Sequence, residues 1–410
     1  MSMSMSSSSR LARHRRSGRY TPAASALGAG VAAAAGLLVL GATGAGASSV
    51  PASLPTPSLP ASPTTPASPT TVVYTETNQA AGNSVLAYSA GPGGALTLIG
   101  TFPTGGTGTG ASPASQGGVV LGDGGHLLAT VNGGSNNVSV FAVQPSGGLQ
   151  LIETTSSGGT DPVSVTINGL WVYALNAGSA TVPANIGGFT LGAPLFHRQD
   201  VVQPLNASAS SPEEISFSPD GRHLVVTEKA SSTIDVFPVN AFGAAGPAVT
   251  TTLAAGTAPY GFQFTADGVA VVSEAGFGGL ATFTINPNGT LNQVSQIADG
   301  QLAACWVALT RNSQEAFTAN AHSGTVSAYT VAPSGTLTLL SPAVQADPGI
   351  ADTDLAVGGN SSLYISDQPD LDVSAISPTG SLSASLPVVT GLPAGTFGLA
   401  ATQPNAPLFP

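Results

Sequence analysis

The sequence is poor in charged residues, and basic residues are the scarcest. Charged residues make up 7% of the 410, with nine Lys and Arg against twenty Asp and Glu. Five of the nine basic residues lie in the first 19 positions, and every acidic residue follows position 75. Without that first segment the chain has four basic against twenty acidic residues, a net charge of −16. Such a surface repels nucleic acid and anionic lipid, so we expect no nucleic-acid partner and favour neutral or cationic ligands.

Cysteine and the common enzyme motifs are also nearly absent. Cys305 is the only cysteine, so no internal disulfide can form and no thiolate metal site exists. The sequence contains no Gly-rich phosphate loop, no zinc signature and no Gly-x-Ser-x-Gly elbow. Apolar residues nevertheless reach 42%, with 52 Gly and 32 Pro. This composition favours a folded all-β chain with frequent turns.

The first 71 residues have the composition of an export signal followed by a linker. A basic stretch ends at Arg19, an apolar segment follows, and "AGA" before Ser48 has the form that signal peptidase accepts. We therefore expect a cleaved signal peptide over residues 1–47, with an uncleaved membrane anchor as the alternative. Residues 48–71 are rich in Pro, Ser and Thr and predict a disordered linker. The mature domain is expected to be secreted and soluble, and an association with a cell wall is compatible with this linker.

The rest of the chain repeats one unit seven times. Each unit contains an alternating strand that ends in a large apolar residue, at intervals of about 46 to 53 positions. These residues are Tyr88, Phe141, Phe189, Phe237, Phe283, Tyr329 and Ile376. Around each one, turn signals separate four short strands, and Asp-Gly recurs at the first hairpin in "LGDGGH", "SPDGRH" and "TADGVA". Four strands in each of seven units predict a seven-bladed β-propeller of four-stranded antiparallel blades.

The predicted propeller spans residues 72–403, with a short tail at 404–410. The first unit lacks its innermost strand, and "TFGLAATQ" (396–403) supplies a strand after the last unit. We expect this C-terminal strand to pair into the N-terminal blade and close the ring, which leaves no open edge. We expect the chain to be a monomer.

The propeller topology sorts polar residues onto two faces. The mouth face is the one that carries the ends of the second strands and the starts of the first strands; the hairpin face carries the Asp-Gly turns. Candidates at second-strand ends are Glu76, Asn132, Asn176, Glu228, Lys229, Glu274, Asn320, His322 and Asp367. The loops into the first strands add Asp161, Glu213, Glu214, Tyr260, Cys305, Trp306, Asp352 and Asp354. Crowded carboxyl groups acquire raised pKa values that suit acid–base chemistry, so the mouth face is the predicted site.

Each of these residues also has a structural interpretation. Asn132, Asn176 and Asn320 can cap their own turns by bonding nearby backbone amides. Cys305 can be a small buried thiol, and as a nucleophile it would need His322 as its base. For Glu228 and Glu274, which are weaker turn formers, the sequence leaves function and structure equally open.

The repeats "FSPDGRHLVVTE…STIDVFPV" and "ALTRNSQEAFTANAHSGTVSAYTV" resemble those of the seven-bladed lactonase family, which includes propeller-type 6-phosphogluconolactonase and carboxymuconate lactonizing enzyme. Surface-layer propellers with YVTN repeats share these motifs. The resemblance implies that Glu274, preceded by Ser273, occupies the carboxylate position of the family. Its basic partners differ: Pro259 and Tyr260 stand where an Arg-His pair is expected, and Glu213 and Glu214 stand where histidines are expected. The cations that would hold a phosphate are therefore missing.

Together these features predict a secreted lactonase-like propeller that hydrolyses a neutral or weakly charged lactone or sugar-derived ester at the mouth of the central channel. Glu274 or Glu228 would be the general base, and Lys229, His322 or Asn320 would polarise the carbonyl. The residues expected to bind the ligand are Asn320, Tyr260, Glu213, Trp306 and Asp367. A divalent cation such as Ca²⁺ or Mg²⁺ would fit the carboxylates. The alternative is a non-catalytic extracellular propeller that binds a small molecule or glycan or serves in surface display.

Overall fold

The computed structural model describes residues 70–192, 201–206, 211–340, 344–345, 354–359 and 361–402. The expected signal peptide, nearly all of the linker, the tail and Asp352 lie outside these residues, so their assignments stay predictions. Within the described ranges, no helix has the length and apolar character needed to span a membrane.

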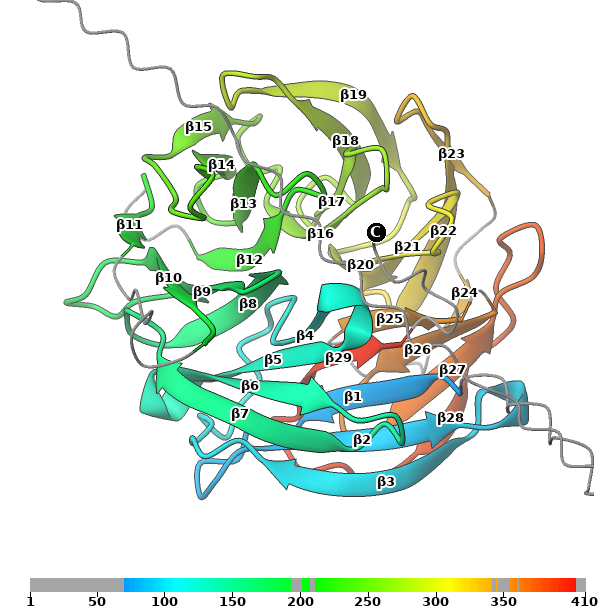
Figure 1. Cartoon of the computed structure of the whole chain (residues 1–410). Coiled ribbons are helices and arrows are strands. Elements are labelled where there is room, and N and C mark those ends of the chain that lie inside the picture. The colour runs from blue at the N-terminus through cyan, green and yellow to red at the C-terminus, as the bar shows by residue number, and fades with distance from the viewer. Residues whose placement is uncertain are drawn as a thin grey trace, which may run out of the picture. The chain divides into compact units, whose positions relative to one another are not determined.

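The described chain forms seven antiparallel sheets, the blades, each with four main strands that follow one another from the inside outward (Figure 1). Blade 1 takes its innermost strand from the C-terminus, and blade 6 has a short fifth strand. Blade 1 contains β29 (Phe397–Ala401), β1 (Val72–Glu76), β2 (Ser84–Ala90) and β3 (Leu96–Pro103). Blade 2 contains β4 (Val119–Gly122), β5 (Leu127–Asn132), β6 (Asn137–Val143) and β7 (Leu149–Ser156). Blade 3 contains β8 (Pro162–Asn168), β9 (Trp171–Asn176), β10 (Asn185–Thr190) and β11 (Val201–Pro204).

The remaining blades follow the same plan. Blade 4 contains β12 (Pro212–Phe217), β13 (His223–Glu228), β14 (Thr233–Pro238) and β15 (Val249–Thr252). Blade 5 contains β16 (Pro259–Phe264), β17 (Ala270–Glu274), β18 (Gly279–Ile285) and β19 (Leu291–Ala298). Blade 6 contains β20 (Ala304–Leu309), β21 (Glu315–Asn320), β22 (Thr325–Val331) and β23 (Leu337–Leu339), and β24 (Val344–Gln345) also pairs with β22. Blade 7 contains β25 (Asp354–Gly358), β26 (Ser362–Ser366), β27 (Leu371–Ala375) and β28 (Leu386–Val389). Helical structure in the described chain comprises the 3-10 turns η1 (Pro92–Gly94), η2 (Asp123–Gly125) and η3 (Gly133–Ser135).

The C-terminal strand closes the ring as the sequence predicts. β29 pairs antiparallel with β1, with Tyr74 opposite Ala400 and Thr75 opposite Leu399. This pairing makes β29 the innermost strand of blade 1, and it packs beside β25 of blade 7 and β4 of blade 2. The predicted seven-bladed, four-stranded architecture is confirmed.

The burial of the strands explains their sequence patterns. The second strands lie between neighbouring blades, so β13 (HLVVTE) is buried on both faces and reads as a nearly continuous apolar run. The outermost strand β19 (LNQVSQIA) has only exposed and half-buried residues because at most one of its faces meets protein. The seven large residues that define the repeat are all buried. They lie in the third strands, except that Ile376 directly follows β27.

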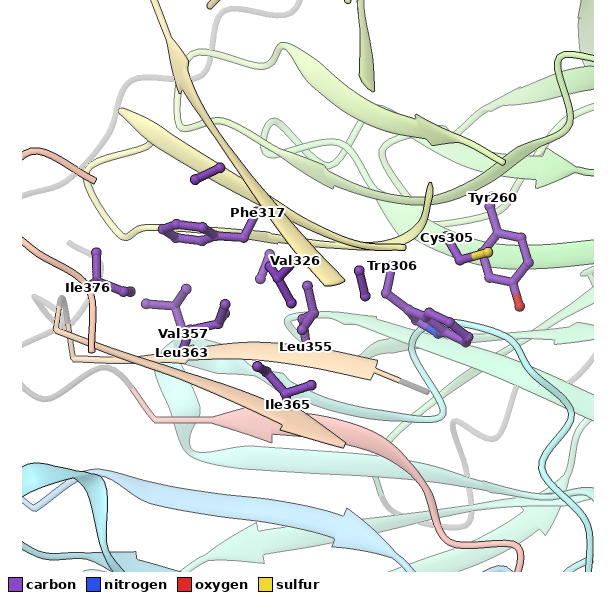
Figure 2. Close-up of a cluster of buried hydrophobic side chains, with 13 residues drawn as sticks. Tyr260, Cys305, Trp306, Phe317, Val326, Leu355, Val357, Leu363, Ile365 and Ile376 are labelled. Carbon is purple, nitrogen blue, oxygen red and sulfur yellow. The ribbon is translucent and has the colours of Figure 1, made fainter. Parts of the chain in front are cut away.

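Apolar clusters fill the spaces between blades. Figure 2 shows the cluster between blades 6 and 7, where Phe317 and Val326 meet Leu355, Leu363 and Ile365. Side-chain hydrogen bonds also cross from one blade to the next. The Tyr74 hydroxyl donates to the Gly147 carbonyl at 2.9 Å, and the Tyr173 hydroxyl donates to the Gly243 carbonyl at 2.7 Å. Each tyrosine thus buries its ring and satisfies its hydroxyl, which fixes the blade spacing.

Candidate functional site

A cavity of about 670 Å³ lies inside the ring of innermost strands. Its lining runs from the starts of these strands, at Gln116, Glu214 and Asp354, to the hairpins after them, at Asp123 and Pro219. Gln116, Glu214 and Asp354 are buried, whereas Asp123 and Pro219 are exposed. The cavity therefore reaches solvent on the hairpin face. Its inner end, at Glu214 and Asp354, belongs to the set of residues that the sequence predicts at the mouth face, whereas its other end lies at the hairpins.

The mouth-face end of the cavity is covered by residues 104–118, which connect β3 to β4 and which we call the sealing segment. The Ser115 hydroxyl donates to the Val163 carbonyl at 2.7 Å, and the Gln116 amide N–H donates to the Glu213 carbonyl at 3.1 Å. The Gln116 side chain reaches blade 6, where it donates to the Val307 carbonyl at 2.7 Å and accepts the Val307 N–H at 2.9 Å. The connection between blades 1 and 2 thereby crosses the channel to the opposite side of the ring.

A β-bulge directs the side chains of two consecutive glutamates, Glu213 and Glu214, to different sites. In the β12–β13 pairing, Pro212 lies opposite Glu228 and Glu214 lies opposite Thr227, so Glu213 is the extra residue of the bulge. A bulge re-aims side chains in this way and often occurs beside functional sites. Glu214 lines the central cavity, while Glu213 forms an ion pair with Lys229 on the mouth face.

Glu214 and Asp354 form a carboxyl pair at the inner end of the cavity. The Glu214 Oε2 accepts the Phe262 N–H at 2.6 Å, and the two Asp354 oxygens accept the N–H groups of Leu355 and Leu399, each at 2.8 Å. Burial raises the pKa of Glu214 well above its ordinary value, and the charge of Asp354 raises it further. Burial raises the pKa of Asp354 to about 8, against the opposing effect of its two backbone hydrogen bonds. The pair therefore retains at least one proton at neutral pH.

Four of the predicted site residues do come together on the mouth face. Lys229 Nζ lies 2.7 Å from Glu213 Oε1 and 4.8 Å from the centroid of the Tyr260 ring. The Tyr260 ring contacts Trp306 edge to face, with centroids 5.3 Å apart. Trp306 donates its indole N–H to the Ser115 carbonyl, which ties this cluster to the sealing segment. Burial raises the pKa of Glu213, although Lys229 opposes this effect.

This mouth-face cluster is largely buried. Trp306 is 3% exposed and Tyr260 is 2% exposed, and Figure 2 shows them with Cys305 at one end of the cluster between blades 6 and 7. Cys305 is itself buried, in agreement with its interpretation as a small core residue. Beside these residues lies a separate hollow of about 580 Å³, whose lining includes Asp161, Glu213 and Lys229.

The predicted residues at the second-strand ends occupy equivalent positions, and all are buried except Lys229 and His322. Glu76, Asn132, Asn176, Glu228, Glu274 and Asn320 each end a second strand, and Asp367 directly follows one. None of these seven side chains lines the central cavity. The Asn320 amide donates to Ser327 on the third strand of its own blade at 2.9 Å, and the Asn132 amide donates to Ser139 in the same way at 2.8 Å. These contacts give both asparagines a structural role, but their partners are serines of the third strand and not the turn amides expected from the sequence.

The carboxyl groups of this set also bond within or between blades. The Glu274 Oε2 accepts from the Gln296 side chain on the outermost strand β19 at 2.6 Å, and burial raises the pKa of Glu274 to about 7. The Glu76 Oε2 accepts from Asn83 at 2.5 Å and from Thr130 of blade 2 at 2.7 Å. His322 is exposed in the turn after β21. The catalytic roles predicted for Glu274, Glu228 and His322 therefore remain predictions.

The sequence does not single out Glu214, Asp354 or Gln116, which the structure places in the lining of the central cavity. Glu214 and Asp354 belong to the predicted mouth-face set, but nothing in the sequence separates them from their neighbours. Gln116 is absent from the predicted site. The detectable signal for it is the unusually long Gly-rich connection "TGGTGTGASPASQGG" (104–118), where the next connection, between β7 and β8, spans only residues 157–161. Among the described residues, no group of three or more His, Cys, Asp or Glu side chains is arranged to hold a metal ion.

Solved structures with the same fold support this architecture. A candidate 6-phosphogluconolactonase from Bacteroides fragilis is 19% identical, with a TM-score of 0.61, over 83% of this chain and 99% of that one. The periplasmic gluconolactonase of Pseudomonas aeruginosa is 18% identical, with a TM-score of 0.64, over 80% and 98%. Virginiamycin B lyase from Staphylococcus aureus is 14% identical, with a TM-score of 0.50, over 70% and 88%. At these identities the likeness establishes the fold alone.

Sequence comparison identifies the family. No curated protein sequence matches the chain. Residues 65–184 and 270–354, together half of the chain, match the family described as "Lactonase, 7-bladed beta-propeller". The matched ranges include the sealing segment, Glu274, Trp306 and Asp354, whereas blade 4 with Glu214 lies between them. With its seven blades, its closing C-terminal strand and this match, the chain belongs to the seven-bladed β-propeller lactonase family.

Proposed function

We propose that the protein hydrolyses an uncharged lactone inside the central cavity, with Glu214 and Asp354 as its acid–base pair. The observation that carries this proposal is the placement of two carboxyl groups at the closed end of one cavity, where burial keeps at least one of them protonated near neutral pH. Pairs of carboxyl groups in different protonation states are a recurrent means of running acid and base chemistry together. Membership of the lactonase family supports the choice of reaction.

The two carboxyl groups have distinct roles in this mechanism. Asp354, held by two backbone N–H groups, ionises first and accepts a proton from the water that attacks the lactone carbonyl carbon. Glu214 keeps its proton because the charge of Asp354 raises its pKa, and it donates a hydrogen bond to the carbonyl oxygen. Collapse of the tetrahedral intermediate breaks the ring C–O bond, and the ring oxygen leaves as a hydroxyl by taking the proton that Asp354 accepted from water, which restores the ionised Asp354. The product is the open-chain hydroxy acid.

The lining of the cavity favours a substrate without charge. Among the described residues, the lining includes no Lys, Arg or His, and two carboxyl groups lie at its inner end. A phosphate or carboxylate on the substrate would have no cationic partner there and would meet the potential of Asp354. A cavity of this volume is in the range of small-molecule sites. The sequence also lacks the basic residues expected at the family positions, which likewise favours an uncharged substrate.

The test is a kinetic comparison of single-atom substitutions in the full chain. D-glucono-1,5-lactone serves as the uncharged probe, and its 6-phosphate serves as the charged one. Glu214→Gln and Asp354→Asn should each lower kcat/KM for the uncharged lactone by about 10²-fold or more, the usual effect of removing a general acid or base. Asp267→Asn, at an exposed position outside the cavity lining, is the matched control and should retain activity. Full activity of both cavity variants would refute the assignment.

A second candidate function is ligand binding without catalysis in the same cavity. The observation that favours it is that both Asp354 oxygens already accept backbone hydrogen bonds, which holds this carboxyl in a fixed position. The two functions separate in one experiment. A lactone or sugar that raises Tm without being consumed would indicate binding alone, whereas turnover lost in the Asp354→Asn variant would indicate hydrolysis.

We place this activity outside the cytoplasm. The support for this part of the proposal is the sequence of residues 1–71 alone, with its signal-like segment and its Pro-rich linker. N-terminal sequencing of protein recovered from the medium would test it, because cleavage should leave Ser48 as the first residue.

A further inference from the structure

The sealing segment makes the two ends of the central cavity unequal. It contacts three other blades: Ser115 bonds to Val163 of blade 3, Gln116 bonds to Glu213 of blade 4, and the Gln116 side chain forms two hydrogen bonds with Val307 of blade 6. Gln116 is 4% exposed and Ser115 is 1% exposed. A buried amide with both its donor and its acceptor paired is costly to displace, so this end of the cavity is firmly closed.

Blade 5 is shaped to receive Gln116. Gly261 in β16 lies against its side chain, and a Cβ built at Gly261 would collide with the Gln116 side-chain oxygen and would lie 2.8 Å from the Cys305 carbonyl oxygen. Any residue other than glycine would therefore force the Gln116 amide out of its place. The indole of Trp306 adds a hydrogen bond of 3.1 Å to the Ser115 carbonyl from the mouth-face side. Blades 3, 4, 5 and 6 all take part in closing the mouth face.

The hairpin end of the cavity has the opposite character. Its lining there comprises residues at or next to the turns between first and second strands, among them Asp123 and Gly124 of blade 2, Asn168 and Gly169 of blade 3, and Pro219 of blade 4. These five residues are exposed. The connections between first and second strands at this rim are two to five residues long, and no described segment forms hydrogen bonds across it comparable to those of the sealing segment.

We propose that ligands enter the central cavity from the hairpin face, and that the turn residues at this rim, rather than the mouth-face loops, select them. The inference rests on the proposed function only for the identity of the ligand; the route follows from the closed mouth face and the exposed rim. It assigns the mouth-face cluster of Glu213, Lys229, Tyr260 and Trp306 to holding the sealing segment in place. Uncharged small molecules are the expected ligands, because Asp123 at the rim repels anions and the described part of the lining has no cation.

A thiol probe inside the cavity measures access without requiring turnover. Ser216 lies on β12 and lines the cavity, so Ser216→Cys places a thiol there, and peptide mass spectrometry separates its alkylation by iodoacetamide from that of buried Cys305. Asn168→Trp narrows the hairpin rim, and Ala180→Trp adds the same bulk at an exposed position beside the mouth-face hollow. Asn168→Trp should slow alkylation of the introduced thiol by about tenfold or more, because thiol reactivity depends on access, whereas Ala180→Trp should leave it unchanged.

Opening the sealed end provides the complementary test. Gln116→Ala removes both hydrogen bonds to Val307 and should restore alkylation in the Asn168→Trp background by creating a second route. Gly261→Ala, which displaces the same amide by collision, should act in the same way if Gln116→Ala does not fold. An unchanged alkylation rate in Asn168→Trp, or slowing by Ala180→Trp instead, would overturn the inference. If the alkylation rates change as expected but no lactone is hydrolysed, the entry route is supported and only the proposed function is contradicted.

Discussion

Glu76 offers a quantitative test of how burial acts on the carboxyl groups of this fold. Its side chain is fully buried where blade 1 meets blade 2. The Oε2 atom accepts from Asn83 and Thr130, while Oε1 is buried without a hydrogen-bond partner in the described structure. Burial raises the pKa of Glu76 from 4.5 to about 8, against the opposing effect of the two hydrogen bonds. The carboxyl group is therefore protonated at neutral pH.

The consequence for stability follows from proton linkage. Between pH 4.5 and 8 the folded protein binds a proton at Glu76 that the unfolded chain has released, so the free energy of unfolding falls as pH rises through this window. The slope contributed by one proton is about 1.4 kcal/mol per pH unit. Above pH 8, the difference between a pKa of about 8 and one of 4.5 corresponds to roughly 5 kcal/mol of lost stability.

Glu76→Gln removes this titration and keeps the shape of the side chain. At pH 5 the variant should be equal to the native protein or less stable by about 1 kcal/mol, because its amide fits the acceptor position less well. At pH 9 it should be more stable by several kcal/mol, so the two stability curves cross. Urea unfolding at a series of pH values from 5 to 9 measures this difference directly.

Thr130→Val is the matched variant for this experiment. It keeps the volume of the side chain but removes one hydrogen bond that favours the ionised form of Glu76, so the loss of stability should extend to higher pH. A Glu76→Gln variant whose stability falls with pH as steeply as that of the native protein would refute the reasoning. It would mean that this carboxyl is solvated or ionised in the folded state.

Three further predictions follow from the same contacts. The lactone-hydrolysing activity should rise with pH up to about 8 as Asp354 ionises and should fall once Glu214 loses its proton; a pH–rate profile flat between pH 6 and 8 would contradict the assigned base. Glu274→Gln should retain activity within about threefold, because the Glu274 carboxyl group bonds to Gln296 on the outermost strand and is outside the cavity lining. A loss of activity of about 10²-fold would instead indicate that Glu274, at the carboxylate position of the family, is the general base. Lys229→Met should lower the free energy of unfolding at pH 8 by about 1 to 3 kcal/mol, because buried Glu213 loses its ion-pair partner while Lys229 itself is partly exposed. The double variant Lys229→Met/Glu213→Gln should recover most of this loss, and a double-mutant cycle measures the recovery.

The location of the carboxyl groups illustrates the limit of sequence reasoning on this chain. Consecutive residues such as Glu213 and Glu214 look equivalent in a one-dimensional pattern, which assigns both to the same face. The bulge at the start of β12 sends one to an ion pair with Lys229 and the other to the central cavity. Similar irregularities occur between Pro259 and Phe262 and between Ala304 and Trp306. A one-residue bulge has no reliable signature in a single sequence, yet it decides which side chains share a site.

The sequence by itself determined the number of blades, their strand order and the closure of the ring. These properties follow from local signals that repeat: apolar runs of strand length, Asp-Gly hairpins, and one unit that lacks a strand which the C-terminus supplies. Only the tertiary structure decided which face of the ring is open. That outcome depends on hydrogen bonds between Gln116 and Val307, residues almost two hundred positions apart that meet across the ring. A periodic sequence pattern predicts which strands are neighbours in a sheet. The contact between Gln116 and Val307 occurs once, across the axis of the ring, so no repeating pattern in the sequence predicts it.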